Sequence, residues 1–177
     1  LHETRESGHG LAVALATLGQ ILVQVGDMDR AERPLKRTLD VRSAVQFHET
    51  TGAVFDTLAR IHLVRGSYVE AEAHLRHAFE AYGSLGGQAM RWYEWALRVL
   101  SVKLATRRGG YDRAVRMAEE WTQTAGVPQS EVIRADLAAC EAFVAANRIE
   151  DAAGHLQRAE GRLDPRAAPA IWGEFLR

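Results

Sequence analysis

The stretch RGSYVEA at residues 65–71 decides the fold, because three related stretches repeat its plan. They are VGDMDRA at 25–31, RGGYDRA at 108–114 and ANRIEDA at 146–152. Each contains a glycine or asparagine, then a short segment of polar residues with one bulky residue, then an anchor alanine at position 31, 71, 114 or 152, so that the spacings are 40, 43 and 38 residues. This self-similarity predicts a helix-turn-helix unit repeated along the chain, in which the small alanine lets two helices lie close together.

Outside these stretches, apolar residues recur every three or four positions and strand-like alternation is almost absent. We therefore expect an all-α chain with helix breaks near Gly26, Gly66, Gly83–Gly87, Gly109–Gly110, Gly126 and Asn147. Ser67 and Glu70 have the spacing of a capping box, which predicts a helix start after Gly66. The bulky residue three positions before each anchor alanine is expected to fill the space between helices; these residues are Met28, Tyr68, Tyr111 and Ile149.

The repeats resemble those of the tetratricopeptide repeat family. The residues that carry the resemblance are Leu15, Leu18, Gly19, Gly26, Asp27 and Ala31 in the first repeat and Phe55, Leu58, Ala59, Gly66, Tyr68, Ala71, Leu75, Ala78 and Phe79 in the second. The resemblance implies one domain over 1–177, a right-handed α-solenoid with repeats at about 11–46, 50–86, 90–126 and 130–165. Residues 167–177, with Trp172 and Phe175, are expected to form a partial fifth repeat or a capping helix, and Leu1 to Gly10 a linker or frayed helix end.

Composition narrows the classes of function. With 22 basic and 23 acidic residues, the net charge is −1, which gives no general attraction to nucleic acid or to an anionic membrane. One cysteine, no signal-peptide pattern and no long apolar run predict a cytoplasmic protein. The alanine and arginine content suggests a bacterial source, and the start at Leu1 suggests a piece of a longer protein.

No catalytic or cofactor motif emerges, so we expect a protein that is not an enzyme and binds no cofactor. Cys140 is expected to be a core residue and not a reactive thiol. His74 and His77, with Glu70 one turn earlier, have spacing that would allow a shared metal, but the favoured interpretation is a solvated polar face without metal. His62 lies in an apolar stripe, which indicates a hydrogen-bonded packing histidine.

An aromatic cluster near the junction between the second and third repeats has two interpretations, a binding platform or packing between repeats. Its members are Tyr82, Trp92, Tyr93 and Trp95. Packing is favoured for the two tryptophans, and Tyr93 is left as a possible contact for a partner.

The expected function is a noncatalytic protein-interaction scaffold that binds a peptide or helix in a concave groove, in a fragment of a bacterial regulatory protein. From the resemblance, the groove residues are Gln20, Gln24, Asp56, Arg60, Val99, Lys103, Arg134 and Glu141. Arg60 and Lys103 would form a basic strip for an acidic partner, either another protein or another domain of the same parent chain. The alternative is a small-molecule-sensing or intramolecular regulatory domain of a bacterial transcription activator. Self-association through exposed solenoid ends is a further possibility.

Overall fold

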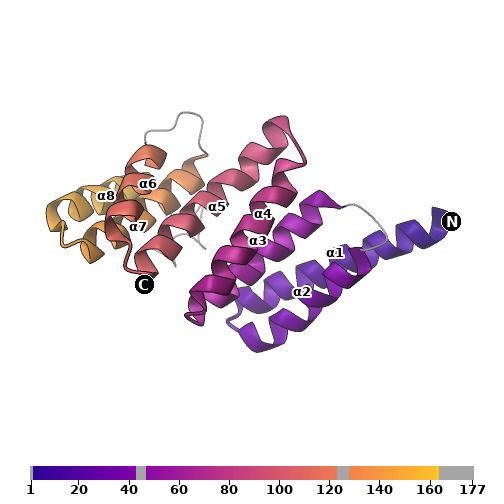
Figure 1. The fold of residues 1–177 in the computed structure, drawn as a ribbon. Helices are drawn as coiled ribbons and strands as arrows, with labels where there is room; N and C mark the ends of the chain where they lie inside the picture. Colours follow the sequence, from indigo (N-terminus) through magenta and orange to yellow (C-terminus); the bar gives the residue numbers. More distant parts are fainter. Residues whose placement is uncertain (1, 43–46, 123–127, 164–177) are drawn as a thin grey trace. The chain divides into compact units, whose positions relative to one another are not determined.

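The computed structural model describes residues 2–42, 47–122 and 128–163, and this part of the chain is all-helical, without strands (Figure 1). The helices are α1 (His2–Gln24), α2 (Met28–Arg42), α3 (His48–Val64), α4 (Tyr68–Gly83), α5 (Gly87–Arg107), α6 (Tyr111–Thr122), α7 (Gln129–Ala145) and α8 (Ile149–Arg162). The all-α prediction is therefore confirmed. Residues 167–177, with Trp172 and Phe175, and the break at Gly126 lie outside the described residues.

The four repeated stretches are the turns inside four helix pairs. Gly26, Gly66, Gly109 and Asn147 have φ angles of 86°, 76°, 78° and 59°, the left-handed conformation that glycine adopts without strain and asparagine tolerates. The residue after each one donates its amide hydrogen to the carbonyl five positions earlier, as in Ser67 N to His62 O at 2.9 Å and Arg148 N to Phe143 O at 2.8 Å. This is the Schellman arrangement, and it explains why the second residue of every stretch is a glycine or asparagine.

The anchor alanines are buried, as expected. Ala31 and Ala114 have no exposed surface, and Ala71 and Ala152 have 2% and 3%. Two of the bulky residues do not fill the predicted space, because Tyr111 is 41% exposed and Ile149 is 57% exposed. A side chain at the start of the second helix lies at the edge of the helix contact, so its size is less constrained there than that of the alanine.

Two other expectations about helix ends need correction. Helix α4 begins at Tyr68, directly after Ser67, but the Ser67 side chain makes no capping hydrogen bond. The start of the helix is instead fixed by the turn at Gly66. At the N-terminus, α1 begins at His2, so most of the stretch expected to be a linker or frayed end is helical. No proline interrupts it.

The chain divides into two compact units, an N-terminal unit ending at Leu97 and a C-terminal unit beginning at Arg98. In the N-terminal unit α1 packs against α2 and α3, and α3 packs against α4. Its core includes Ala16, Leu35, Val54, Leu58 and Ile61. In the C-terminal unit α7 packs against α6 and α8.

Close helix contact in the N-terminal unit depends on two glycines. A Cβ added to Gly19 would lie 2.5 Å from the Leu35 side chain, and one added to Gly52 would lie 2.4 Å from the Tyr82 ring. Both distances are far below van der Waals contact. Helix α1 can therefore lie this close to α2, and α3 to α4, only because these positions have no side chain. Among the described helices, none is both long enough and apolar enough to cross a membrane.

Candidate functional site

A continuous row of four aromatic rings lies along the contact between α3 and α4. The His62 and His74 ring centroids are 5.0 Å apart and nearly parallel, at 26°. His74 stacks on Phe55 at 5.9 Å, and His77 lies 5.0 Å from the same phenylalanine. Three histidines from two helices are therefore held by ring contacts.

Two nitrogen atoms in this row are buried without a hydrogen-bond partner: Nδ1 of His62 and Nδ1 of His74. Burial lowers the pKa of His74, and the nearby His62 and His77 lower it further, because each disfavours a second positive charge. His62 packs as predicted, with its ring against His74, but its Nδ1 does not make the predicted hydrogen bond.

The proposed metal pair is arranged differently from the expectation. His74 is half-buried against Phe55 and His62, so it does not lie on a solvated face, whereas His77 is exposed and lies 3.2 Å from a Glu80 carboxylate oxygen. Within the described ranges, no group of three histidine, cysteine or acidic side chains is placed to hold a metal ion.

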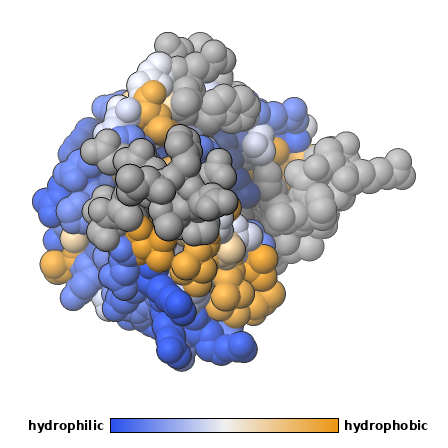
Figure 2. All heavy atoms as spheres, turned by 90° about the vertical axis from the view of Figure 1, so that its right-hand side faces the viewer, coloured by the Kyte–Doolittle hydropathy of each residue, from blue (hydrophilic) through white to orange (hydrophobic). Residues whose placement is uncertain are grey.

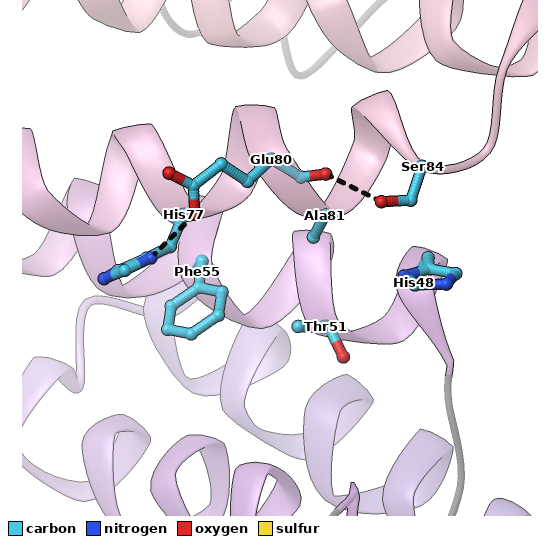
Figure 3. Close-up of a pocket in the computed structure, with 7 residues that line it drawn as sticks. All are labelled: His48, Thr51, Phe55, His77, Glu80, Ala81 and Ser84. Carbon is cyan, nitrogen blue, oxygen red and sulfur yellow. Dashed lines mark hydrogen bonds and ion pairs between the residues drawn. The ribbon is translucent and has the colours of Figure 1, made fainter.

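A pocket of about 330 Å³ opens beside this row, between the first half of α3 and the last half of α4 (Figure 3). It is lined by His48, Thr51, Phe55, His77, Glu80, Ala81 and Ser84. The Phe55 ring lies below His77 and Glu80, and the Ser84 hydroxyl donates to the Glu80 carbonyl at 3.1 Å. Glu80 is the one acid among the lining residues and lies 3.2 Å from His77 Nδ1, and none of the lining residues is lysine or arginine.

The aromatic cluster forms a second packed arrangement in the N-terminal unit. Tyr82 is buried, and its ring lies parallel to that of Tyr93, with centroids 4.1 Å apart. Tyr93 donates its hydroxyl to Glu49, and this hydrogen bond raises the pKa of Tyr93 to about 12. Tyr93 is thus half-buried and bonded within the protein. Trp95 is also half-buried, and the side chain of Trp92 lies outside the described part.

The groove residues expected in the N-terminal unit lie on the first helices of two neighbouring pairs. Gln20 on α1 and Asp56 on α3 are half-buried, whereas Gln24 and Arg60 are exposed. Arg60 Nε lies 3.0 Å from an Asp56 carboxylate oxygen, one turn earlier. The positive charge of Arg60 is therefore offset within its own helix.

The remaining groove residues belong to the C-terminal unit. Lys103 Nζ lies 3.7 Å from a Glu141 carboxylate oxygen, and Arg134 lies 2.6 Å from Glu131. Val99 is buried, with 8% exposed, so little of it is left for a partner to contact. Arg60 and Lys103 belong to different units, so the basic strip stays a prediction. Each has a carboxylate partner, Asp56 or Glu141, that offsets its positive charge.

A buried acid in the last helix pair was not predicted from the sequence. Asp136 on α7 is 1% exposed, and its two carboxylate oxygens are shared by three residues of α8. His155 Nδ1 lies 2.9 Å away, Arg162 2.6 Å and Arg158 3.4 Å. The His155 ring stacks on Phe143 at 5.0 Å. Aligning the repeats on their anchor alanines would have drawn attention to these residues, because His155 lies three residues after Ala152 as His74 lies three residues after Ala71.

Cys140 is half-buried and not fully inside the core. Burial raises the pKa of its thiol, and Glu141 raises it further. The thiol therefore stays protonated at neutral pH, which agrees with the expectation that it is not reactive.

Comparison with known proteins yields a fold and no family. No family model matches the sequence, and no curated protein matches it. Among solved structures, the crystal structure of BtubC (BKLC) from P. vanneervenii is similar, with a TM-score of 0.66 and 17% sequence identity. The match covers 89% of this chain and 63% of that one, so the chain spans less than two thirds of its length. At this identity the likeness supports the all-helical fold alone.

Proposed function

We infer that this chain is a noncatalytic protein-interaction module, a right-handed solenoid of tetratricopeptide-like repeats that binds a peptide. Support for the repeat architecture comes from the four glycine or asparagine turns, the buried anchor alanines and the packing of α1 beside α3. Such stacked helix pairs commonly present a surface for an extended or helical peptide.

The observation that carries the binding function is the pocket between α3 and α4 (Figure 3). Its volume of about 330 Å³ is at the lower end of ligand sites, and it suits one large side chain better than a whole ligand. Phe55 supplies an aromatic face, and Glu80 supplies a carboxylate next to it. A guanidinium group stacks on aromatic faces and pairs with carboxylates, so the pocket fits an arginine of the peptide.

Binding of matched peptide pairs tests this function directly. Extended peptides containing one arginine, and the same peptides with citrulline at that position, are to be measured against the full chain by fluorescence polarisation. We expect arginine peptides to bind more tightly, because citrulline keeps the planar shape and loses the charge. Glu80→Gln should weaken arginine binding about threefold, the size of one exposed ion pair.

Glu70→Gln is the matched control, since Glu70 is an exposed acid on the same helix but outside the pocket. If Glu70→Gln and Glu80→Gln have the same effect, the pocket is not where the arginine binds. Failure of every arginine peptide to bind would refute peptide recognition at this site.

A further inference from the structure

One side of helix α1 and of the residue that follows it is apolar and faces solvent. Leu11, Leu18 and Ile21 on the helix are 43%, 48% and 50% exposed, and Val25, directly after its end, is 72% exposed. We call these four residues the α1 stripe. Their spacing of seven, three and four residues places them in one line of about 21 Å along the helix. An exposed row of large apolar side chains is costly in water and is typical of an interaction surface.

The α1 stripe is not used by the N-terminal unit itself. The side of α1 that packs inward carries Ala12, Ala16 and Gly19, and Gly19 lies against Leu35 of α2. With about 100° of rotation per residue, the centre of the stripe lies roughly 150° around the helix from these three small residues. The stripe also carries no charge, because residues 7–26 contain no aspartate, glutamate, lysine or arginine.

Helix α2 adds positive charge at the border of the stripe. Its inner side carries Ala31 and Leu35 toward α1, and Glu32 lies toward the end of α3, where Arg65 bonds to it at 2.6 Å. On the opposite side from Glu32, beyond the buried Pro34, are Arg30, Arg33 and Arg37, all exposed. We call these three the arginine row. At intervals of three and four residues, they follow one line along α2.

Helical geometry places the arginine row along one edge of the α1 stripe. Gly19 meets Leu35, so the middle of α1 lies level with the middle of α2. Figure 2 views the molecule from the side at which α1 begins, and it shows that apolar and hydrophilic side chains both reach the surface on this side. Within the described part of the row, Arg30 pairs with Asp27 at 3.3 Å, and Asp27 is the residue just before α2.

We propose that the α1 stripe and the arginine row together dock one amphipathic helix of a partner protein, with apolar residues at heptad spacing and glutamate or aspartate along one flank. The apolar side of that helix would cover the stripe, and its acidic flank would lie over the arginines. This surface is separate from the α3–α4 pocket and does not depend on peptide binding there. A second copy of the chain fits less well, because its own α1 stripe has no carboxylates to offer the arginine row.

The test uses the full chain and two labelled synthetic helical peptides of 21 residues. Both have leucine at heptad positions; one has glutamate along one flank, and the other has lysine at the same places. We expect the glutamate peptide to bind at least about tenfold more tightly, and Leu18→Ser/Ile21→Ser to reduce its binding by about tenfold or more. Arg33→Glu/Arg37→Glu should reverse the preference between the peptides. The double serine variant should stay folded by circular dichroism, because both side chains are about half exposed.

Val69→Ser is the control, since Val69 is 71% exposed on α4 and belongs to neither surface. Equal binding of the two peptides, or binding that Leu18→Ser/Ile21→Ser leaves unchanged, would overturn the proposal. So would a mass in sedimentation that doubles with concentration and returns to 19.6 kDa in the double serine variant, because the stripe would then belong to a second copy.

Discussion

Helix pairs α3–α4 and α7–α8 hold a histidine at the same position, by aromatic packing in the first pair and by a buried carboxylate in the second. Three residues after the anchor alanine, both have a histidine, His74 or His155. Nine residues before the alanine, each has a ring on which that histidine stacks, His62 or Phe143, at 5.0 Å in both pairs. Sixteen residues before it, however, α3 has Phe55 and α7 has Asp136.

This one difference changes what holds the histidine. In α3–α4 the imidazole stacks on Phe55, and its buried Nδ1 has no hydrogen-bond partner. In α7–α8 the imidazole is bonded to a buried carboxylate, which also binds Arg158, the counterpart of His77. The turn glycine or asparagine and the anchor alanine therefore define the helix pair, whereas the position facing the histidine accepts either a ring or a charge.

The largest effect is expected from removing the charge in α7–α8. Asp136→Ala should lower the stability of this pair by about 3 kcal/mol, because His155 and two arginines lose a buried partner. Native-state hydrogen exchange of the α7 and α8 amides measures the loss locally. The control is Asp151→Asn, which removes an exposed ion pair to Arg148 and should cost no more than about 0.5 kcal/mol. Equal losses in the two variants would mean that Asp136 is not central to the pair.

A smaller effect is expected from disturbing the close packing of α3–α4. Gly52→Ala would place a methyl group 2.4 Å from the buried Tyr82 ring, so the ring or the helix must move. We expect a loss of about 2 kcal/mol from this overpacking, again read from hydrogen exchange. Gly83→Ala is the matched control, because a methyl group there meets no atom within 4 Å. Should Gly52→Ala be as stable as the parent chain, the helices of this pair are not held at that distance.

Much of this fold was predictable, because the features that define a helix pair are local. A turn that needs a left-handed residue requires glycine or asparagine, and close helices require alanine, so Gly66 and Ala71 are visible in a single sequence. The sizes of Tyr111 and Ile149 did not predict their burial, because a bulky residue at the edge of a helix contact can remain exposed.

The candidate site was less predictable, because its contacts join residues far apart in the sequence. Periodicity places Phe55 and His74 on helices but does not show that their rings meet. The charges of Arg60 and Lys103 were visible, but their pairing with Asp56 and Glu141 depends on side-chain positions. The contact of Asp136 with His155 could have been predicted, because their positions relative to Ala152 match those of Phe55 and His74 relative to Ala71.

A third prediction separates hydrogen bonding from stacking in the N-terminal unit. Tyr93→Phe keeps the ring against Tyr82 and removes the hydrogen bond to Glu49, so we expect a loss of about 1 kcal/mol at neutral pH. The pKa of Tyr93 is raised to about 12, above the ordinary value of 10.0. The unfolded chain therefore loses its proton first, and this contribution disappears as the pH rises from 10 to 12. Chemical denaturation of both proteins at pH 8 and pH 11 should show the difference shrinking; a constant difference would contradict the assignment.

The smallest expected effect is a pH dependence of α3–α4 that comes from His74. Burial lowers the pKa of His74 from 6.5, so below that pH the unfolded chain binds the proton more readily than the folded one. Stability should fall as the pH is lowered from 7 to 5, because His62, His77 and Lys36 disfavour the added charge and only Glu32 favours it. His74→Phe keeps a ring on Phe55 and should flatten this slope in hydrogen exchange of α4, whereas His48→Gln should leave it. An unchanged slope in His74→Phe would mean that another group causes the pH dependence. The replacement of Asp136 by Phe55 at this position would then not explain it.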